Sequence, residues 1–143
     1  MQADVSSLDG TLVDRMGIKI LELSAERVVG TMPVAGNNQS GGPMYASASC
    51  VLAETLAWSG SAAHGGPERA AAVIEISATH HRAAADGSIT GVATRVHGGR
   101  TLVTYQVEIT DSRGRRVCTA QLTCLLRDRP AGPPGSEEAA TAR

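Results

Sequence analysis

The amino-acid sequence predicts an α+β fold in which one curved antiparallel sheet wraps around one long helix. The first observation is a helical pattern of small and apolar residues from Ala46 to about His64, which ends at Gly65-Gly66-Pro67. The second is a set of alternating patterns that predicts two strands before this helix and four after it. One sheet folded around one apolar helix is the economical way to bury that helix.

The chain has the size and composition of one domain. Its 143 residues are 42% hydrophobic, which is enough to bury a core. We expect a single domain over residues 1–127 and a disordered tail over residues 128–143, where Pro, Gly, Ala and charged residues prevail. The net charge of −1 leaves no basic stripe, and this argues against nucleic acid as a partner.

The N-terminal third predicts a hairpin and a loop. Residues 3–12 have the pattern of a short amphipathic helix. Segments 16–23 and 27–34 alternate, with Met16, Ile18 and Ile20 of the first on one face, and the short gap between them predicts a hairpin. Residues 35–43 contain repeated Gly and Asn and one Pro, which are typical of a loop.

The helix and the four later strands each have a predicted inward face. On the helix this face holds Ala48, Val51, Leu52, Thr55, Leu56 and Ser59. The strands are expected over 70–83, 87–97, 100–110 and 115–126, joined by hairpin-sized turns that contain Gly. Their inward residues, where the pattern is clear, are Ile74, Ile76, Ala78 and His80; then Val103, Tyr105, Val107 and Ile109; then Cys118, Ala120, Leu122, Cys124 and Leu126.

Several features that the sequence lacks indicate the expected location and oligomeric state of the protein. Met1 is followed by polar and acidic residues without an apolar signal segment, and no run is long enough for a membrane span. The three cysteines are expected to be reduced, buried thiols of a cytoplasmic protein. A core with no Phe, one Trp and two Tyr is thin, so we expect a homodimer or a homotetramer.

Glu54 is the one acidic residue of the predicted helix, which carries no Lys or Arg. Helical spacing places Ser47, Cys50, Trp58 and Ser61 beside it. Such a carboxylate is either solvated at the helix edge or part of a catalytic site. We expect no metal, because His80 and His81 point to opposite faces of their strand and no other His or Cys has ligand spacing.

Two stretches resemble the PaaI-type, 4-hydroxybenzoyl-CoA-thioesterase-like branch of the hotdog-fold acyl-CoA thioesterases. In the first, Asn38, Gln39, Gly42 and Glu54 match the family's residues in order and spacing. In the second, "ISATHHRAA" (76–84) is similar to a strand of the family's enterobactin-type members. The resemblance covers about residues 12–127 and implies a hotdog fold, a sheet curved around one central helix.

The resemblance also implies an activity, the hydrolysis of an acyl thioester, with aryl thioesters among the candidates. It assigns Glu54 as nucleophile or general base, and the backbone N–H of Ala46 as the group that polarises the carbonyl. Gln39 would orient water or the carbonyl. Coenzyme A or the phosphopantetheine of an acyl carrier protein would enter as part of the substrate, and no other cofactor is implied.

Further residues take substrate-binding roles through the resemblance. His80 and Arg82 belong to the second motif and would bind substrate, His80 at a position that contacts substrate in the enterobactin-type members. His97 and Arg100 stand in a Gly turn that approaches the nucleotide end of coenzyme A in the family, and an Arg there presents a fork of donors to phosphate. Trp58, one turn after Glu54, would form the wall of the acyl pocket or block it.

The chain departs from the family at the helix start. The family's His-Gly-Gly is here Tyr45-Ala46-Ser47, so Tyr45 takes the place of the His. This leaves two alternatives to hydrolysis. One is a biosynthetic hotdog enzyme that uses Glu54 in acid–base chemistry on a bound acyl or polyketide intermediate, and the other is a non-catalytic acyl-binding protein.

Overall fold

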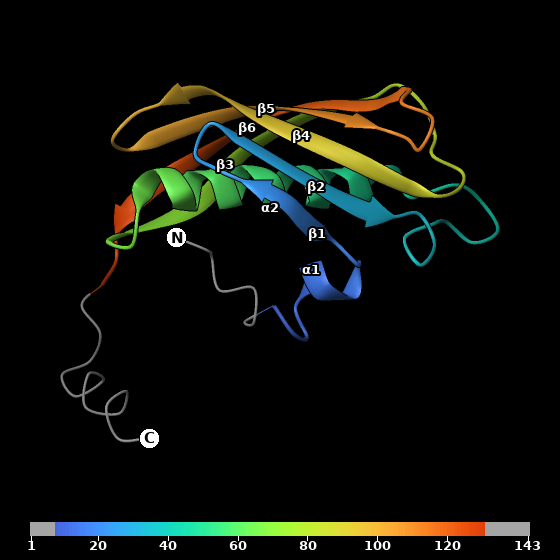
Figure 1. The fold of residues 1–143 in the computed structure, drawn as a ribbon, viewed down its shortest axis with the longest axis horizontal. Coiled ribbons are helices and arrows are strands. Elements are labelled where there is room, and N and C mark those ends of the chain that lie inside the picture. Colours follow the sequence, from blue (N-terminus) through green and yellow to red (C-terminus); the bar gives the residue numbers. More distant parts are fainter. Residues whose placement is uncertain (1–7, 131–143) are drawn as a thin grey trace.

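The structure is a computed structural model and describes residues 8–130. One antiparallel sheet of six strands in the order β1-β2-β4-β5-β6-β3 curves around a long helix, α2, as Figure 1 shows. The elements are α1 (Leu12–Arg15), β1 (Lys19–Leu23), β2 (Arg27–Pro33), α2 (Ala46–Gly65), β3 (Arg69–His80), β4 (Ser88–Gly98), β5 (Leu102–Thr110) and β6 (Arg116–Asp128). This arrangement confirms the predicted α+β fold.

Small residues let α2 lie close to the sheet. Its buried face is composed of Ala48, Ser49, Leu52, Ala53, Leu56, Ala57, Gly60 and Ser61. Gly66, with a φ of 72°, ends the helix, since only glycine adopts this conformation freely. The predicted face was partly right, because Val51, Thr55 and Ser59 lie at its half-buried margin.

Two glycines of the sheet make room for Leu56. Gly30 of β2 and Gly91 of β4 are directly opposite each other in the ladder. A Cβ atom on either glycine would come within 2.7 Å of a Leu56 methyl group. Leu56 therefore sits on a gap in the sheet that no other residue type would leave open.

Tyr105 is the aromatic residue that fills the core. Its side chain is fully buried, and its hydroxyl donates a hydrogen bond to the carbonyl of Ala25 at 2.5 Å. Burial raises the pKa of this phenol to about 12, so the hydroxyl stays protonated. The ring lies against Gly60 of α2, where a Cβ atom would be 2.5 Å from the Tyr105 oxygen.

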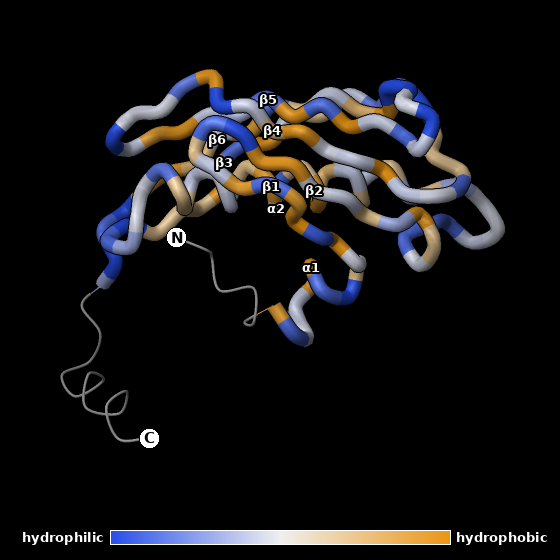
Figure 2. Tube along the Cα trace, in the orientation of Figure 1, coloured by the Kyte–Doolittle hydropathy of each residue, from blue (hydrophilic) through white to orange (hydrophobic). Residues whose placement is uncertain are grey.

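The strand faces follow the predicted alternation on β5 and β6, where every predicted inward residue is buried. In Figure 2, hydrophilic residues gather at the turns and apolar residues run through the strands. On β3 the prediction was wrong for Ile74, which is 56% exposed. A register shift between Val73 and Glu75 places Ile74 outside the alternation. Beyond it, Ile76, Ala78 and His80 pair with the inward residues of β6, but only Ala78 is partly buried, since Ile76 is 39% exposed and His80 is exposed too.

Three predictions concern the ends of the chain. The helix expected over residues 3–12 begins outside the described residues. Of the part that is described, residues 8–11 are not helical, and helix α1 begins at Leu12. Strand β6 runs through Asp128, one residue past the expected domain boundary, and the N–H of Arg129 bonds the carbonyl of Glu68. Most of the expected tail, residues 131–143, lies outside the described part. Among residues 8–130, no helix is both long and apolar enough to cross a membrane.

We predict that Gly60→Ala destabilises the protein. Inside a helix this change normally stabilises by up to about 1 kcal/mol. Here the new methyl group would overlap the Tyr105 ring, and we expect a net loss of about 1–3 kcal/mol in the free energy of unfolding. Denaturant titration measures this loss.

The matched control is Ala63→Gly at an exposed position of the same helix, which reports the intrinsic Gly–Ala difference of about 1 kcal/mol. A Gly60→Ala protein that is more stable than the wild type would contradict the proposed packing of Tyr105 on α2.

Candidate functional site

The loop before α2 is held rigidly by its backbone neighbours. The side-chain amide of Asn37 donates to the carbonyls of Met16 and Pro33, both at 2.8 Å. The carbonyl of Asn37 accepts the N–H of Tyr45 at 2.9 Å, directly before the helix begins. The first turn of α2 therefore has a fixed position relative to the end of β2.

The helix begins without a side-chain cap. Tyr45 is the N-cap residue, and its side chain makes no capping hydrogen bond and is 59% exposed. The first N–H groups of a helix have no acceptor within the helix, and the helix dipole is positive at this end. Ala46 is the first helical residue, so its N–H faces a space where negative charge is stabilised.

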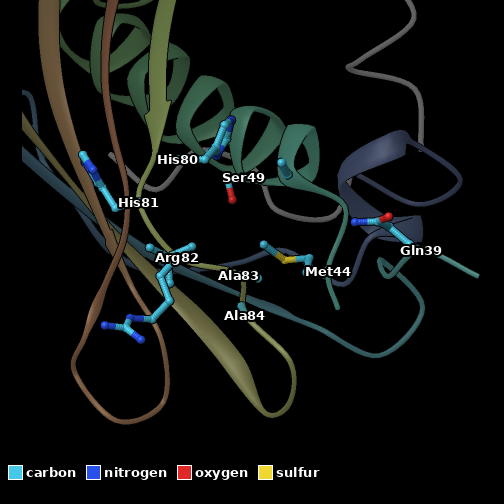
Figure 3. Close-up of a pocket in the computed structure, with 10 residues that line it drawn as sticks. Gln39, Met44, Ser49, His80, His81, Arg82, Ala83 and Ala84 are labelled. Carbon is cyan, nitrogen blue, oxygen red and sulfur yellow. The ribbon is translucent and has the colours of Figure 1, made fainter. Parts of the chain in front are cut away.

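A cavity of about 260 Å³ opens beside this helix start. Its walls come from the loop, from α2 and from the segment after β3, as Figure 3 shows. The lining residues are Gln39, Met44, Ala46, Ser49, His80, His81, Arg82, Ala83, Ala84 and Val117. Four of the residues expected from the sequence, namely Gln39, Ala46, His80 and Arg82, thus meet around one cavity.

Sequence reasoning missed the residues that form the inner wall of this cavity. Met44 and Ser49 are buried, and the N–H of Met44 donates to the carbonyl of Ala84 at 2.8 Å. Ser49 follows Ala46 by three residues, which is one helical turn, and this spacing was the signal that could have identified it. Met44, Ala84 and Val117 carry no such signal, because their chemistry is that of ordinary core residues.

Glu54 does not line the cavity. It lies on an exposed side of α2, and it forms no ion pair with any residue in 8–130. Eight residues separate it from Ala46, which is about 12 Å along the helix axis at 1.5 Å per residue. One thioester carbonyl cannot touch both groups of the same chain.

Cys50 carries the thiol near Glu54. The Sγ atom of Cys50 lies 3.9 Å from Nε2 of His80. Burial, and then the negative charge of Glu54, raise the pKa of Cys50, so the thiol stays protonated. In residues 8–130 all three cysteines are free, and Cys118 and Cys124 are fully buried.

Trp58 is tied to the neighbouring strand. Its indole N–H donates to the carbonyl of Ala71 in β3 at 2.9 Å, and the side chain remains 46% exposed. The ring therefore stands one turn after Glu54 in a fixed orientation over β3.

His97 and Arg100 lie at the other end of the molecule from the cavity. Both are exposed, His97 near the end of β4 and Arg100 on the turn between β4 and β5. His64, at the end of α2, holds this turn, since its Nε2 atom lies 2.9 Å from the carbonyl oxygen of Gly99. His64 follows Ala46 by 18 residues, or about 27 Å of helix, so one chain does not bring the turn to the cavity.

No group of three or more His, Cys, Asp or Glu side chains comes together as a metal site within residues 8–130.

Comparison with known proteins gives a consistent result. The model of the thioesterase superfamily matches residues 41–118. The proofreading thioesterase EntH of Cronobacter turicensis is 36% identical over 118 residues, which cover 82% of this chain and 86% of that protein.

Solved structures share the fold. A mutant of the thioesterase PA1618 from Pseudomonas aeruginosa has 27% identity and a TM-score of 0.82, with 87% of this chain and 91% of that chain covered. A hypothetical thioesterase protein of Streptococcus pneumoniae, crystallised with coenzyme A, has 21% identity and a TM-score of 0.73, with 83% and 93% covered.

Proposed function

Since the chain belongs to the thioesterase superfamily and is a thioesterase of the hotdog fold, we propose that it hydrolyses an acyl thioester with Glu54 as the catalytic carboxylate. The observation that carries this proposal is the cavity at the start of α2, where Gln39 and the uncapped N–H of Ala46 meet. The leaving thiol is coenzyme A or the phosphopantetheine of an acyl carrier protein.

The N–H of Ala46 polarises the thioester carbonyl. Attack on the carbonyl carbon moves negative charge onto its oxygen, and a helix N-terminus stabilises an anion at that place. The group that acts is a backbone N–H, so the change of the family's Gly to Ala46 retains it. Gln39, from the rigid loop, orients the carbonyl or the attacking water.

We assign Glu54 to the cavity of a second subunit. A carboxylate that acts as nucleophile or general base has to reach within about 3 Å of the atom it attacks or deprotonates. Within one chain Glu54 is about 12 Å along the helix from Ala46, so the site is incomplete in a monomer. The active enzyme is therefore a homodimer, or a homotetramer built from such dimers.

A dimer with two-fold symmetry would bring the missing carboxylate to the site. When two α2 helices lie antiparallel around a two-fold axis at Cys50, Ala46 of one chain is opposite Glu54 of the partner subunit. Each of these residues is four positions from the axis, which is about 6 Å. Strand β3 is an edge strand with a free side and exposed Ile74 and Ile76, and it is the surface that we assign to this pairing.

The same arrangement provides a path for the carrier arm. His64 follows Glu54 by ten residues, so the turn with His97 and Arg100 of the partner subunit is about 15 Å beyond its Glu54. A thioester held at the cavity would extend its pantetheine arm along this distance. Arg100 would then meet a phosphate of coenzyme A through its fork of donors.

The first prediction is that Glu54→Gln nearly abolishes turnover, because it removes the carboxylate and keeps the size of the side chain. We expect kcat to fall by about 10²–10⁴-fold in an assay of released thiol. Glu68→Gln, in the exposed turn after α2, is the matched control. A Glu54→Gln enzyme with more than about a tenth of the wild-type kcat would contradict the assignment.

The second prediction tests the shared site by mixing two inactive variants. In a heterodimer of Glu54→Gln and Gln39→Ala chains, one site receives Gln39 from the first chain and Glu54 from the second, and is wild type. The other site carries both changes. We expect activity to return when the two proteins are unfolded and refolded together.

If Glu54 and Gln39 of the same chain form each site, every site in the mixture has one defect and no activity returns. Light scattering provides a second check, since the particle should have at least twice the mass of one chain, 14.7 kDa. A monomer at micromolar concentration would contradict the shared site.

The third prediction concerns Tyr45, which replaces the family's His. We expect Tyr45→Phe to lower kcat by about ten- to a hundredfold with little change in KM, as for a lost donor to the carbonyl oxygen. Tyr45→His together with Ala46→Gly restores the family motif and should recover or raise hydrolysis. An unchanged kcat in Tyr45→Phe would show that the phenol only fills space.

A further inference from the structure

Ser49 carries a buried hydroxyl without a partner. The side chain is fully buried in α2, and its Oγ atom has no hydrogen-bond partner among the residues described. Thr55 and Ser59 of the same helix are different, because each donates to the carbonyl four residues earlier at 2.7 Å. Leaving a buried hydroxyl unpaired is costly, and one that faces a cavity can regain a partner from a bound ligand.

This hydroxyl belongs to the wall of the cavity at the start of α2. Figure 3 shows its oxygen directed into the space bordered by Met44, Ala83 and Ala84. These neighbours are apolar, and they suit the hydrocarbon body of an acyl group. Ser49 is therefore the polar group on the side of the cavity formed by Met44, Ala83 and Ala84, while Gln39, His80, His81 and Arg82 supply the other polar side chains of the lining.

We propose that Ser49 hydrogen-bonds an oxygen substituent on the acyl group, so that the enzyme prefers acyl thioesters with a hydroxyl or oxo group near the carbonyl. This inference rests on the proposed function, in which the N–H of Ala46 holds the thioester carbonyl. Ser49 is three residues further along the helix, which is about 4.5 Å of axial rise. A substituent a few bonds from the carbonyl carbon spans that distance.

The preference for acyl groups that carry an oxygen substituent is expected with or without water in the empty cavity. A hydroxyl group can both donate and accept, so it pairs with a hydroxyl or with an oxo group of the acyl chain. An acyl group without oxygen at this place displaces any water on Ser49 and returns no hydrogen bond. Sites built to bond a substrate hydroxyl reject the analogue that lacks it for this reason.

The test measures binding in the Glu54→Gln background, where the thioester stays intact. The probes are two matched sets: butyryl-CoA against 3-hydroxybutyryl-CoA, and benzoyl-CoA against the hydroxybenzoyl-CoA isomers. We expect a hydroxylated member of at least one set to bind about tenfold or more tightly than its parent. Adding Ser49→Ala should reduce this ratio to within about threefold of one.

Ser61→Ala is the matched control. Ser61 is a second buried serine of α2 without a hydrogen-bond partner among the described residues, and it is outside the cavity. Its removal should leave the binding ratio unchanged, while a general loss of stability would affect both serine variants alike.

Three results would overturn the proposal: a ratio near one in both sets, a ratio that Ser49→Ala leaves unchanged, or no measurable binding of any probe. The proposed function has a separate outcome. If wild-type protein hydrolyses none of the probes while the ratio depends on Ser49, the catalytic assignment fails and the role of Ser49 stands.

Discussion

The close contact between α2 and the sheet is the constraint on which the rest of the structure depends. Leu56 fits over the paired glycines Gly30 and Gly91, and Tyr105 lies against Gly60. At both places a single methyl group would push the helix away. The helix can therefore pack against the sheet at one distance and in one orientation only. Its first turn is fixed relative to the cavity that it borders.

Functional groups at different positions along a rigid helix are separated by distances that the axial rise per residue fixes. Ala46 begins the helix, Glu54 follows about 12 Å along it, and His64 holds the far turn at about 27 Å. No side-chain movement closes such distances within a chain. A symmetric second copy closes them at once, because antiparallel helices bring different heights together. The length of α2 thus makes dimerisation a condition of the proposed chemistry.

The role that we propose for the helix start is compatible with the changed motif. Polarisation of the carbonyl depends on a free backbone N–H and the helix dipole, and neither depends on the side chain. Ala46 can therefore replace a glycine without removing the acting group. Side chains around it, such as Ser49 at the inner wall, then remain available to set which acyl group is accepted.

The sequence by itself determined the order of elements and most inward faces, because the periods of helix and strand are local properties of the chain. Through its resemblance to a family motif, the sequence also offered Glu54, Gln39 and Ala46 as candidate site residues, because a motif can be compared without coordinates. Ile74 was misplaced because a β-bulge depends on the partner strand and leaves no mark in the alternation.

The tertiary structure decided which of these residues share a space. Gln39, Ala46, His80 and Arg82 surround one cavity, while Glu54, His97 and Arg100 do not reach it. Ser49 is one of several serines in the sequence, and what distinguishes it is a buried hydroxyl without a hydrogen bond that also lies on the cavity wall. Whether a polar group has a partner depends on every element packed around it, and that is a property of the folded chain alone.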